Sequence, residues 1–272
     1  MDKPVAAREN PGDREMALIE FHDVHKSFGP KVVYAGLSLA IERGEAFTIL
    51  GGSGVGKSVM LKMLIGLLKP DRGEILFDGE SVRGMDDRRL ARLRQRVGMV
   101  FQGAALFDSL TVRENVAYGL REHLRMSESE IDERVAWALA LVGLPGIELM
   151  NPSDLSGGMR KRTGLARTIA LKPEVLLYDE PTTGLDPINT TRINNLVMSL
   201  QRTLGNTSIV VTHDMGTAFT VSTRLAMVYK GQIIATGDPV TFRASPNPIV
   251  RNFIEGVAPE DEDMAALVER QA

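Results

Sequence analysis

One stretch of eight residues, 51–58, constrains the fold more than any other part of the chain. Its sequence, GGSGVGKS, follows an apolar run at residues 46–50 and precedes a helical pattern at residues 59–68. A glycine-rich turn between a strand and a helix lets backbone N–H groups converge on phosphate oxygens, and the helix N-terminus adds its positive dipole end. In such a loop Lys57 reaches the β- and γ-phosphates and the Ser58 hydroxyl ligates Mg²⁺. The alternative is a glycine turn that only caps a helix.

The rest of the chain has the pattern of an α/β fold. Short apolar runs alternate with longer segments of 3.6-residue period, which is typical of a mostly parallel sheet with helical crossovers. A hairpin signal around Lys230-Gly231, within residues 224–236, is expected to close one sheet edge. The strands predicted before it are residues 17–21, 37–41, 46–50, 73–77, 97–101, 175–178 and 208–212.

Residues 111–172 contain helical patterns and no convincing strand. Thr111 with Glu114, and Ser127 with Glu130, match the capping box, in which a hydroxyl and a carboxylate satisfy backbone donors at a helix start. We therefore predict an all-helical subdomain at about residues 103–172, inserted in a larger α/β domain at residues 16–249. Residues 1–15 are predicted to be a flexible tail, and residues 250–272 a C-terminal extension.

Composition excludes several classes of function. The chain has 272 residues, no cysteine and a formal net charge of −3. A disulfide scaffold, a thiol nucleophile and a cysteine metal site are therefore excluded, and a coat of positive charge for nucleic acid is absent. His22 and His25 are expected to be surface residues without partners, so no transition-metal site is predicted.

An apolar run at residues 175–178 ends in two carboxylates, Asp179 and Glu180. Consecutive side chains of a strand point to opposite faces, so these two carboxylates have different roles. In a phosphate-loop ATPase, Asp179 would hold the Mg²⁺ shell and Glu180 would polarise the attacking water. The alternative is a strand end that dips into solvent.

A second anion site is predicted where Ser156, Gly157 and Gly158 precede a helical pattern that runs to about Leu171. These residues leave backbone N–H groups and a helix N-terminus unobstructed. Because one loop already holds a nucleotide, the second site suits the γ-phosphate of a nucleotide held by another copy. The basic run at residues 160–162 is interpreted as a solvated or subunit-facing surface rather than a nucleic-acid patch.

These motifs resemble those of the ABC ATPases, whose signature is usually Leu-Ser-Gly-Gly-Gln; here Met159 replaces the glutamine. Phe28 resembles the aromatic that stacks on adenine, with a core or loop aromatic as the alternative. Gln102 resembles the residue that links Mg²⁺ and the nucleophilic water to the membrane partner, with a solvated glutamine as the alternative. His213 matches the switch histidine, and Asp186 the D-loop at the dimer seam. Asp186 is also a good N-cap before Pro187.

The resemblance implies a RecA-like phosphate-loop core with an antiparallel β subdomain and an inserted all-helical subdomain. It implies ATP hydrolysis, with ATP and Mg²⁺ as cofactors, by a homodimer. The implied ATP-binding residues are Phe28, Gly51, Gly52, Ser53, Gly54, Val55, Gly56, Lys57, Ser58 and Val59. The implied catalytic residues are Lys57, Gln102, Glu180 and His213. The implied Mg²⁺ ligands are Ser58, Gln102 and Asp179. The residues implied to contact ATP bound by the partner protomer are Ser156, Gly157, Gly158 and Asp186.

The branch of the family is suggested by Met159, by Val59 where threonine is usual, and by the sequence of residues 115–123. Together they resemble the ATPases of Mla/Mce-type systems, which maintain outer-membrane lipid asymmetry by moving phospholipid between inner and outer membranes. This resemblance implies a peripheral location at the cytoplasmic face of a bacterial inner membrane. The implied partners are a permease, an MCE-domain protein and often a STAS-domain subunit. Members of this branch also tend to carry a C-terminal extension that contacts the partner protomer. Residues 250–272 are expected to be either this extension or a free disordered tail.

Two other functions stay open. One is an importer of a soluble solute, which nothing in the predicted fold excludes. The other is a non-transport ABC ATPase, disfavoured by the single phosphate loop, the acidic charge, and the short span between Ser58 and Leu155. The apolar segment at residues 101–116 is either plain core or the lining of a groove for a permease helix.

Overall fold

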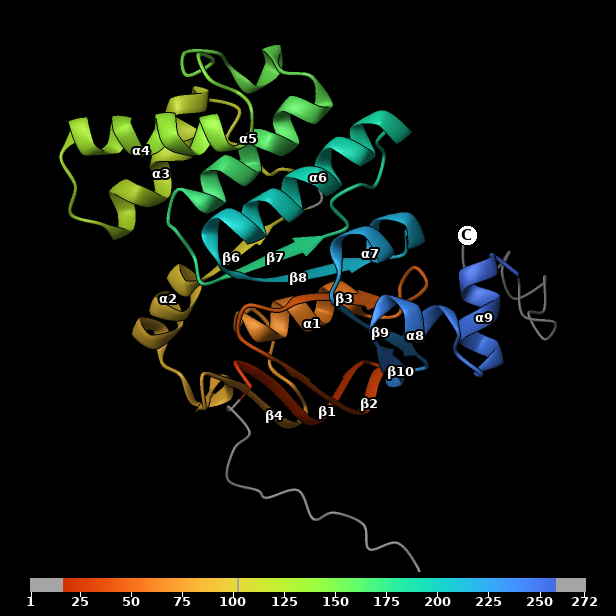
Figure 1. Cartoon of the computed structure of the whole chain (residues 1–272). Coiled ribbons are helices and arrows are strands. Elements are labelled where there is room, and N and C mark those ends of the chain that lie inside the picture. The colour runs from red at the N-terminus through yellow and green to blue at the C-terminus, as the bar shows by residue number, and fades with distance from the viewer. Residues whose placement is uncertain (1–16, 102, 258–272) are drawn as a thin grey trace, which may run out of the picture.

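The computed structural model describes residues 17–101 and 103–257, which form two sheets and three groups of helices (Figure 1). The larger sheet has six strands in the order β10-β9-β3-β8-β7-β6. Its pairs are parallel except for β9 with β10, an antiparallel hairpin that closes one edge as predicted. The six strands are β3 (Ala46–Leu50), β6 (Val97–Val100), β7 (Val175–Asp179), β8 (Thr207–Thr212), β9 (Arg224–Tyr229) and β10 (Gln232–Gly237).

Central strands of this sheet are covered on both faces, which explains their continuous apolar runs. Every residue of β3, β7 and β8 is buried. Along β7, Val175 and Leu177 pack into the core between the two sheets, whereas Leu176 and Tyr178 pack into the core under the helical layer. The alternation therefore sends the side chains of β7 into two separate cores.

The smaller sheet is antiparallel, in the order β2-β1-β4-β5. Its strands are β1 (Ile19–Phe28), β2 (Lys31–Ile41), β4 (Arg72–Phe77) and β5 (Glu80–Ser81). The first two extend well beyond the predicted 17–21 and 37–41. Register shifts between Phe21 and Val24, and between Lys26 and Ser27, interrupt the alternation that a sequence pattern relies on.

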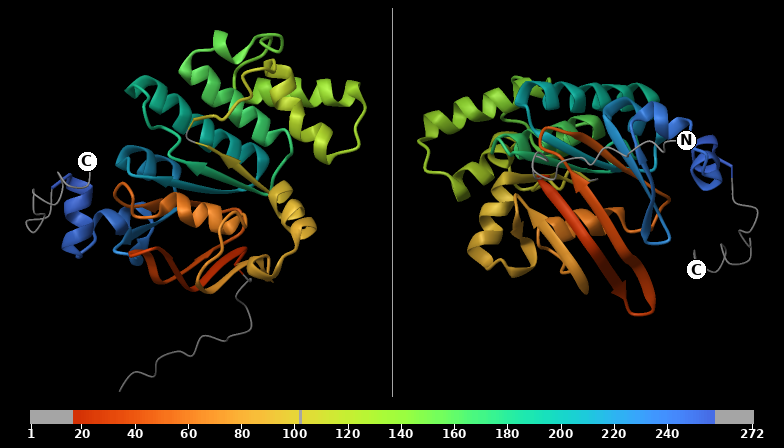
Figure 2. Two further views of the ribbon diagram at one scale, coloured as in Figure 1. Left: turned by 180° about the vertical axis from the view of Figure 1, so that it is seen from behind. Right: turned by 60° about the horizontal axis from the view of Figure 1, so that its bottom comes forward.

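Helix α1 (Lys57–Leu64) lies between the sheets, and Met60, Leu61, Met63 and Leu64 pack into their shared core (Figure 2). Helix α2 (Asp87–Arg96) was not predicted, because Leu90 and Leu93 are its only large apolar residues in a stretch rich in arginine. The C-terminal part carries α7 (Met215–Val221), α8 (Pro239–Arg243) and α9 (Pro248–Glu255).

A helical layer covers the other face of the large sheet. It comprises α3 (Val112–His123), α4 (Glu128–Leu141), α5 (Gly157–Ile169) and α6 (Pro187–Leu204). Both capping boxes form as predicted, at Thr111 with Glu114 and at Ser127 with Glu130. Two short 3₁₀ helices are also present in the described chain, at Val82–Gly84 and Pro152–Asp154.

The predicted fold class is therefore confirmed: an α/β core, an antiparallel β sheet and an all-helical insertion. Helix α9 crosses the boundary predicted between residues 249 and 250, because Val250 is buried against Phe242 and Leu225. The predicted tail at residues 1–15 and the end of the extension, residues 258–272, lie outside the described residues. Within the described part of the chain, no helix has the length and apolar character needed to cross a membrane.

Gly73 tests the packing between β4 and the turn of β1. A Cβ at Gly73 would lie 2.2 Å from the Asp23 carbonyl oxygen and 2.5 Å from that of His22, at a φ of +81°. Gly44 has a similar φ of +75° with no atom within 4 Å of its Cβ position, so Gly44→Ala measures the conformational cost alone. Gly73→Ala is expected to lower the free energy of unfolding by about 1–3 kcal/mol more than Gly44→Ala, measured by urea denaturation. Equal losses would contradict the close packing.

Candidate active site

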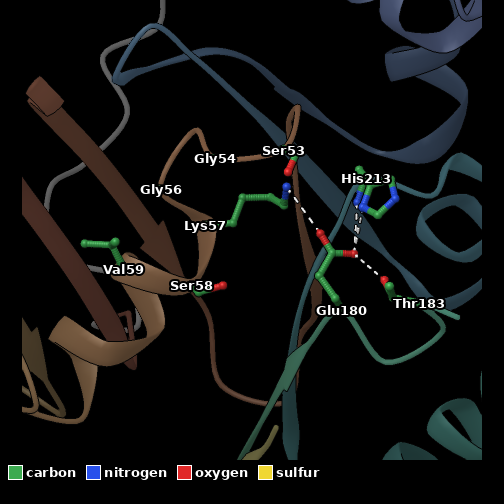
Figure 3. Close-up of a pocket in the computed structure, with 9 residues that line it drawn as sticks. All are labelled: Ser53, Gly54, Gly56, Lys57, Ser58, Val59, Glu180, Thr183 and His213. Carbon is green, nitrogen blue, oxygen red and sulfur yellow. Dashed lines mark hydrogen bonds and ion pairs between the residues drawn. The ribbon is translucent and has the colours of Figure 1, made fainter. Parts of the chain in front are cut away.

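The candidate site lies where three parallel strands end. The loop of residues 51–56 follows β3, Glu180 follows β7 and His213 follows β8. Carboxyl ends of parallel strands meet at one edge of a sheet, which is where α/β proteins bind ligands. A cavity of about 370 Å³ opens at this edge (Figure 3). It is lined by Ser53, Gly54, Gly56, Lys57, Ser58, Val59, Glu180, Thr183 and His213.

The loop is held in shape by its glycines and by Tyr34. Gly56 has a φ of +109°, and a Cβ there would lie 2.3 Å from Cγ1 of Val33, so a side chain would displace the neighbouring strand. The buried Tyr34 hydroxyl donates a hydrogen bond of 2.5 Å to the Gly56 carbonyl oxygen. Burial raises the pKa of Tyr34, which keeps this donor protonated.

Lys57 is the buried cation of the site. Its Nζ donates to the carbonyl oxygens of Gly51 at 2.7 Å and Gly52 at 3.0 Å, and lies 3.3 Å from Oε1 of Glu180. Only 6% of its side chain is exposed, so little solvent screens these contacts. The ammonium group is therefore placed at the centre of the loop, between its carbonyls and the carboxylate after β7.

Ser58 and Asp179 are joined by a hydrogen bond beside the cavity. The Ser58 hydroxyl donates to Oδ1 of Asp179 at 2.7 Å. Asp179 shares its strand face with Val175 and Leu177, which points it toward α1, where Ser58 lies in the first turn. The structure therefore brings together the hydroxyl and the carboxylate that the motifs assign to one metal ion.

Glu180 has three partners. Nδ1 of His213 lies 3.0 Å from its Oε2, the Thr183 hydroxyl donates to the same oxygen at 3.4 Å, and Lys57 contacts the other oxygen. Its φ of +49° is unusual for a residue with a Cβ, and such strain is concentrated at functional sites. Burial alone would raise the pKa of Glu180, but the hydrogen bond of His213 and the charge of Lys57 outweigh it and hold the pKa below its usual value.

The residues predicted to act in trans do not line this cavity. Ser156 caps α5 by accepting from the Met159 N–H at 3.2 Å, and Asp186 caps α6 by accepting from Ile188 and Asn189. Asp186 is thus the N-cap that the sequence predicted. A Cβ at Gly157 would meet no atom within 4 Å, so the backbone there is open to a ligand or a second chain.

Phe28 also lies apart from the cavity lining. Phe28 ends β1 with 46% of its surface exposed, and Nζ of Lys26 lies 5.2 Å from its ring centroid. Gln102 lies outside the described residues. Thr183 and Tyr34 are the contributors that sequence analysis missed. Thr183 belongs to no recognised motif element, and Tyr34 belongs to the part of β2 that was not predicted.

The expectation that His22 and His25 lack partners is wrong. Nε2 of His22 lies 3.1 Å from a carboxylate oxygen of Glu20, and Nε2 of His25 lies 3.2 Å from one of Asp23. Both imidazoles are on the surface, as predicted. Each pair joins residues of one strand that lie two positions apart, so their side chains share one face of the sheet.

Comparison with known families decides the identity of this fold. The profile of the ABC transporter family matches residues 34–183. The chain belongs to the ABC transporter family. It is the ATP-binding, ATP-hydrolysing type of subunit, as the motifs predicted.

Its relatives cover most of the chain. It is 46% identical over 265 residues to Protein TRIGALACTOSYLDIACYLGLYCEROL 3, chloroplastic, of Arabidopsis thaliana, covering 91% of this chain and 75% of that one. It is 39% identical to the intermembrane phospholipid transport system ATP-binding protein MlaF of Escherichia coli K12, covering 89% and 90%. It is 41% identical to the probable ribonucleotide transport ATP-binding protein mkl of Mycobacterium tuberculosis, covering 93% and 72%.

Solved structures share the fold. CbiO1 of Clostridium perfringens, part of the ABC transporter complex cbiONQ, superimposes with a TM-score of 0.78 at 30% identity, covering 94% of this chain and 100% of its own. A dimeric post-hydrolysis state of the ATP-binding cassette MJ0796, bound to ADP and phosphate, gives a TM-score of 0.74 at 31% identity, covering 81% and 98%.

The lowered pKa of Glu180 predicts how stability depends on pH. The ionised carboxylate favours the folded state, so its contribution is complete above the unfolded-state pKa and is lost as pH falls through the lower folded-state value. The difference in unfolding free energy between wild type and Glu180→Gln should therefore stay constant from pH 7 to about 5 and shrink as pH falls below the ordinary carboxyl pKa of 4.5 toward about 3. Urea denaturation across this range measures it, with Glu122→Gln, an exposed change on α3, as the charge control. A difference that grows toward low pH would contradict the assignment.

Proposed function

We propose that this chain is the ATPase subunit of an ABC transporter that moves phospholipid between inner and outer membranes and so maintains outer-membrane lipid asymmetry. The observation that carries the proposal is the similarity to MlaF over nearly the full length of both chains, 89% and 90%. It is supported by Val59 and Met159, the two departures from the common ABC motifs that prompted the Mla/Mce resemblance. The alternative, import of a soluble solute, is not favoured, because the chain covers 90% of MlaF but only 72% of the mkl relative, whose name refers to ribonucleotide transport.

Two copies are proposed to bind ATP between them, head to tail. Ser156, Gly157, Gly158 and Asp186 do not line the cavity of their own chain, so they are available to a nucleotide held by the other copy. The backbone at Gly157 is open, and α5 directs its positive dipole end outward there. ATP then completes the interface, and hydrolysis releases it.

Mg²⁺ is proposed to be held by Ser58 and Asp179, with Gln102 as the third predicted ligand. Hydroxyl and carboxylate oxygens 2.7 Å apart are the hard donors that Mg²⁺ prefers, and they lie beside the loop that would hold the phosphates. When bound, the ion neutralises charge on the β- and γ-phosphates.

Glu180 is proposed to accept the proton of the attacking water. Lys57 now bonds to the carbonyls of Gly51 and Gly52 and pairs with Glu180; phosphate oxygens would replace these partners and leave the carboxylate to face the water. His213, 3.0 Å from Glu180, orients the carboxylate and contacts the γ-phosphate. Lys57 stabilises the charge that develops on the transferred group.

A second cavity of about 450 Å³ is proposed to receive a cytosolic segment of the permease. It lies between α2 with β6 on one side and α3 with α5 on the other, and it includes the exposed aromatics Phe101, Phe107 and Tyr118. Phe107 and Tyr118 stack with ring centroids 4.8 Å apart. Val112 and Val116, from the same apolar segment, are core instead. The segment at residues 101–116 is therefore proposed to serve both as core, through Val112 and Val116, and as groove lining, through Phe101 and Phe107.

The remaining assignments follow from the Mla/Mce resemblance. The complex is proposed to contain an MCE-domain protein and a STAS-domain subunit, with this chain at the cytoplasmic face of the inner membrane. Residues 250–272 are proposed to contact the partner protomer. The domain limits proposed for the chain are residues 1–15, 16–249 and 250–272, so the C-terminal extension is proposed to begin within α9.

Glu180→Gln tests the catalytic assignment. The amide keeps the shape of the side chain but cannot accept the proton of water, so kcat should fall about 100-fold or more while ATP still binds. Because hydrolysis no longer releases the nucleotide, ATP should trap a dimer, detected by light scattering after gel filtration. Wild type with ADP should stay monomeric under the same conditions. An unchanged hydrolysis rate would rule out Glu180 as the base.

Purification from native membranes in mild detergent tests the transport assignment. A permease, an MCE-domain protein and bound phospholipid should co-purify with the tagged chain and be identified by mass spectrometry. A permease with a solute-binding protein would replace lipid by a soluble substrate, and soluble partners alone would refute transport.

The same purification tests the groove. Tyr118→Asp places a charge on its aromatic wall and should reduce recovery of the permease at least about tenfold, the equivalent of about 1.4 kcal/mol of binding. Leu149→Asp is the matched control, because Leu149 is 84% exposed and does not line the groove. Equal recovery with both variants would move the permease site elsewhere.

A further inference from the structure

The basic side chains at the start of α5 are held by backbone carbonyl oxygens. Arg160 donates to Leu155 at 2.8 Å, and Arg162 donates to Val142 at 3.2 Å and to Gly143 at 3.1 Å. Lys161 donates to Pro181 at 3.1 Å and to Thr183 at 2.7 Å. Arg160 is exposed, whereas Lys161 is only partly exposed and reaches from the helical layer to the loop that follows Glu180.

The loop after β7 joins Glu180 to Asp186, two carboxylates that are proposed to contact different nucleotides of the dimer. Glu180 begins it beside the cavity, and Asp186 ends it at the N-cap of α6. Thr183 lies between them and has two partners: its carbonyl oxygen accepts from Lys161, and its hydroxyl donates to Glu180 at 3.4 Å. One residue therefore connects Nζ of Lys161 with the carboxylate proposed to act as base.

The environment of Lys161 is costly for a charge. Burial lowers the pKa of Lys161, and no carboxylate among the described residues contributes a compensating attraction. A partly buried ammonium that is met by carbonyl dipoles alone adds little to stability compared with an apolar side chain of similar size. Lys161 instead fixes geometry, because two of its N–H donors hold two carbonyl oxygens of one turn at a fixed distance from α5.

We propose that Lys161 is a positioning residue that couples the two ATP sites of the dimer. This inference rests on the proposed head-to-tail dimer. Ser156, at the N-terminus of α5, meets ATP held by the partner, and the rigid first turns of the helix carry any shift of Ser156 to Lys161. Through Thr183, Lys161 then moves or holds Glu180 of its own chain. Occupancy of one site thereby sets the geometry of the carboxylate in the other.

Steady-state hydrolysis by the full chain, measured against ATP concentration, tests the coupling. Lys161→Met keeps the length of the side chain and removes all its donors. We expect kcat to fall about tenfold and the Hill coefficient to fall to about 1, while the affinity of the phosphate loop for a fluorescent ATP analogue changes less than about twofold. Lys161→Arg keeps donors and charge, and should recover most of the rate and the cooperativity.

Arg162→Met is the matched control. Arg162 is on the same helix and also donates to backbone carbonyls, but these belong to the end of α4, away from the turn. It should lower the thermal midpoint as much as Lys161→Met does, or more, and leave the Hill coefficient unchanged.

Four results would overturn the inference. Loss of rate with unchanged cooperativity in Lys161→Met would make Lys161 a local support of Glu180. Equal loss of cooperativity in Arg162→Met would make the effect one of general stability. A wild type that hydrolyses ATP with a Hill coefficient of about 1 would remove the coupling but leave the proposed ATPase intact, whereas a wild type without ATPase activity would refute both.

Discussion

The parallel register of β3, β7 and β8 is the constraint on which the site depends. Leu50 pairs with Thr212, and Asp179 pairs with Val211, so three strands end at one level. Their next residues are the phosphate loop, Glu180 and His213. Parallel strands of this kind need helices on both faces, and the two cores on either side of the sheet provide that cover. The ion contacts of Glu180 follow from this register rather than from proximity in sequence.

Sequence patterns predicted those strands and helices that have one regular apolar periodicity or a recognisable capping motif. The apolar runs of β3, β7 and β8 and the capping boxes at Thr111 and Ser127 were predicted because local chemistry alone specifies them. The long hairpin of β1 and β2 was predicted only in part, because bulges break its alternation. Helix α2 was missed because capping by Asp86 and packing of Leu90 and Leu93 hold it, rather than a strong apolar stripe.

Site residues divide in the same way. The motif residues Lys57, Ser58, Asp179, Glu180 and His213 come together as expected from strand order. Thr183 and Lys161 could not be assigned from sequence, since their roles depend on which backbone carbonyl or carboxylate the tertiary fold brings within reach. A charge run on a helix start is usually solvated, and only the packing of α5 against the loop after β7 brings Lys161 to two backbone carbonyls here.

Among the described residues, the starts of α1 and α5 are the two that are proposed to bind anions, and the sequence has a single phosphate-loop motif. This count favours a nucleotide shared between copies over one bound by a single chain. Mixing two inactive variants tests that arrangement most directly: Lys57→Ala, which disables the loop, and Ser156→Phe, which blocks the second anion site. If ATP lies between copies, the mixture regains up to about a quarter of wild-type hydrolysis, because a mixed dimer contains one intact site. If both motifs act within one chain, the mixture stays as inactive as its components, and the shared-site account is wrong.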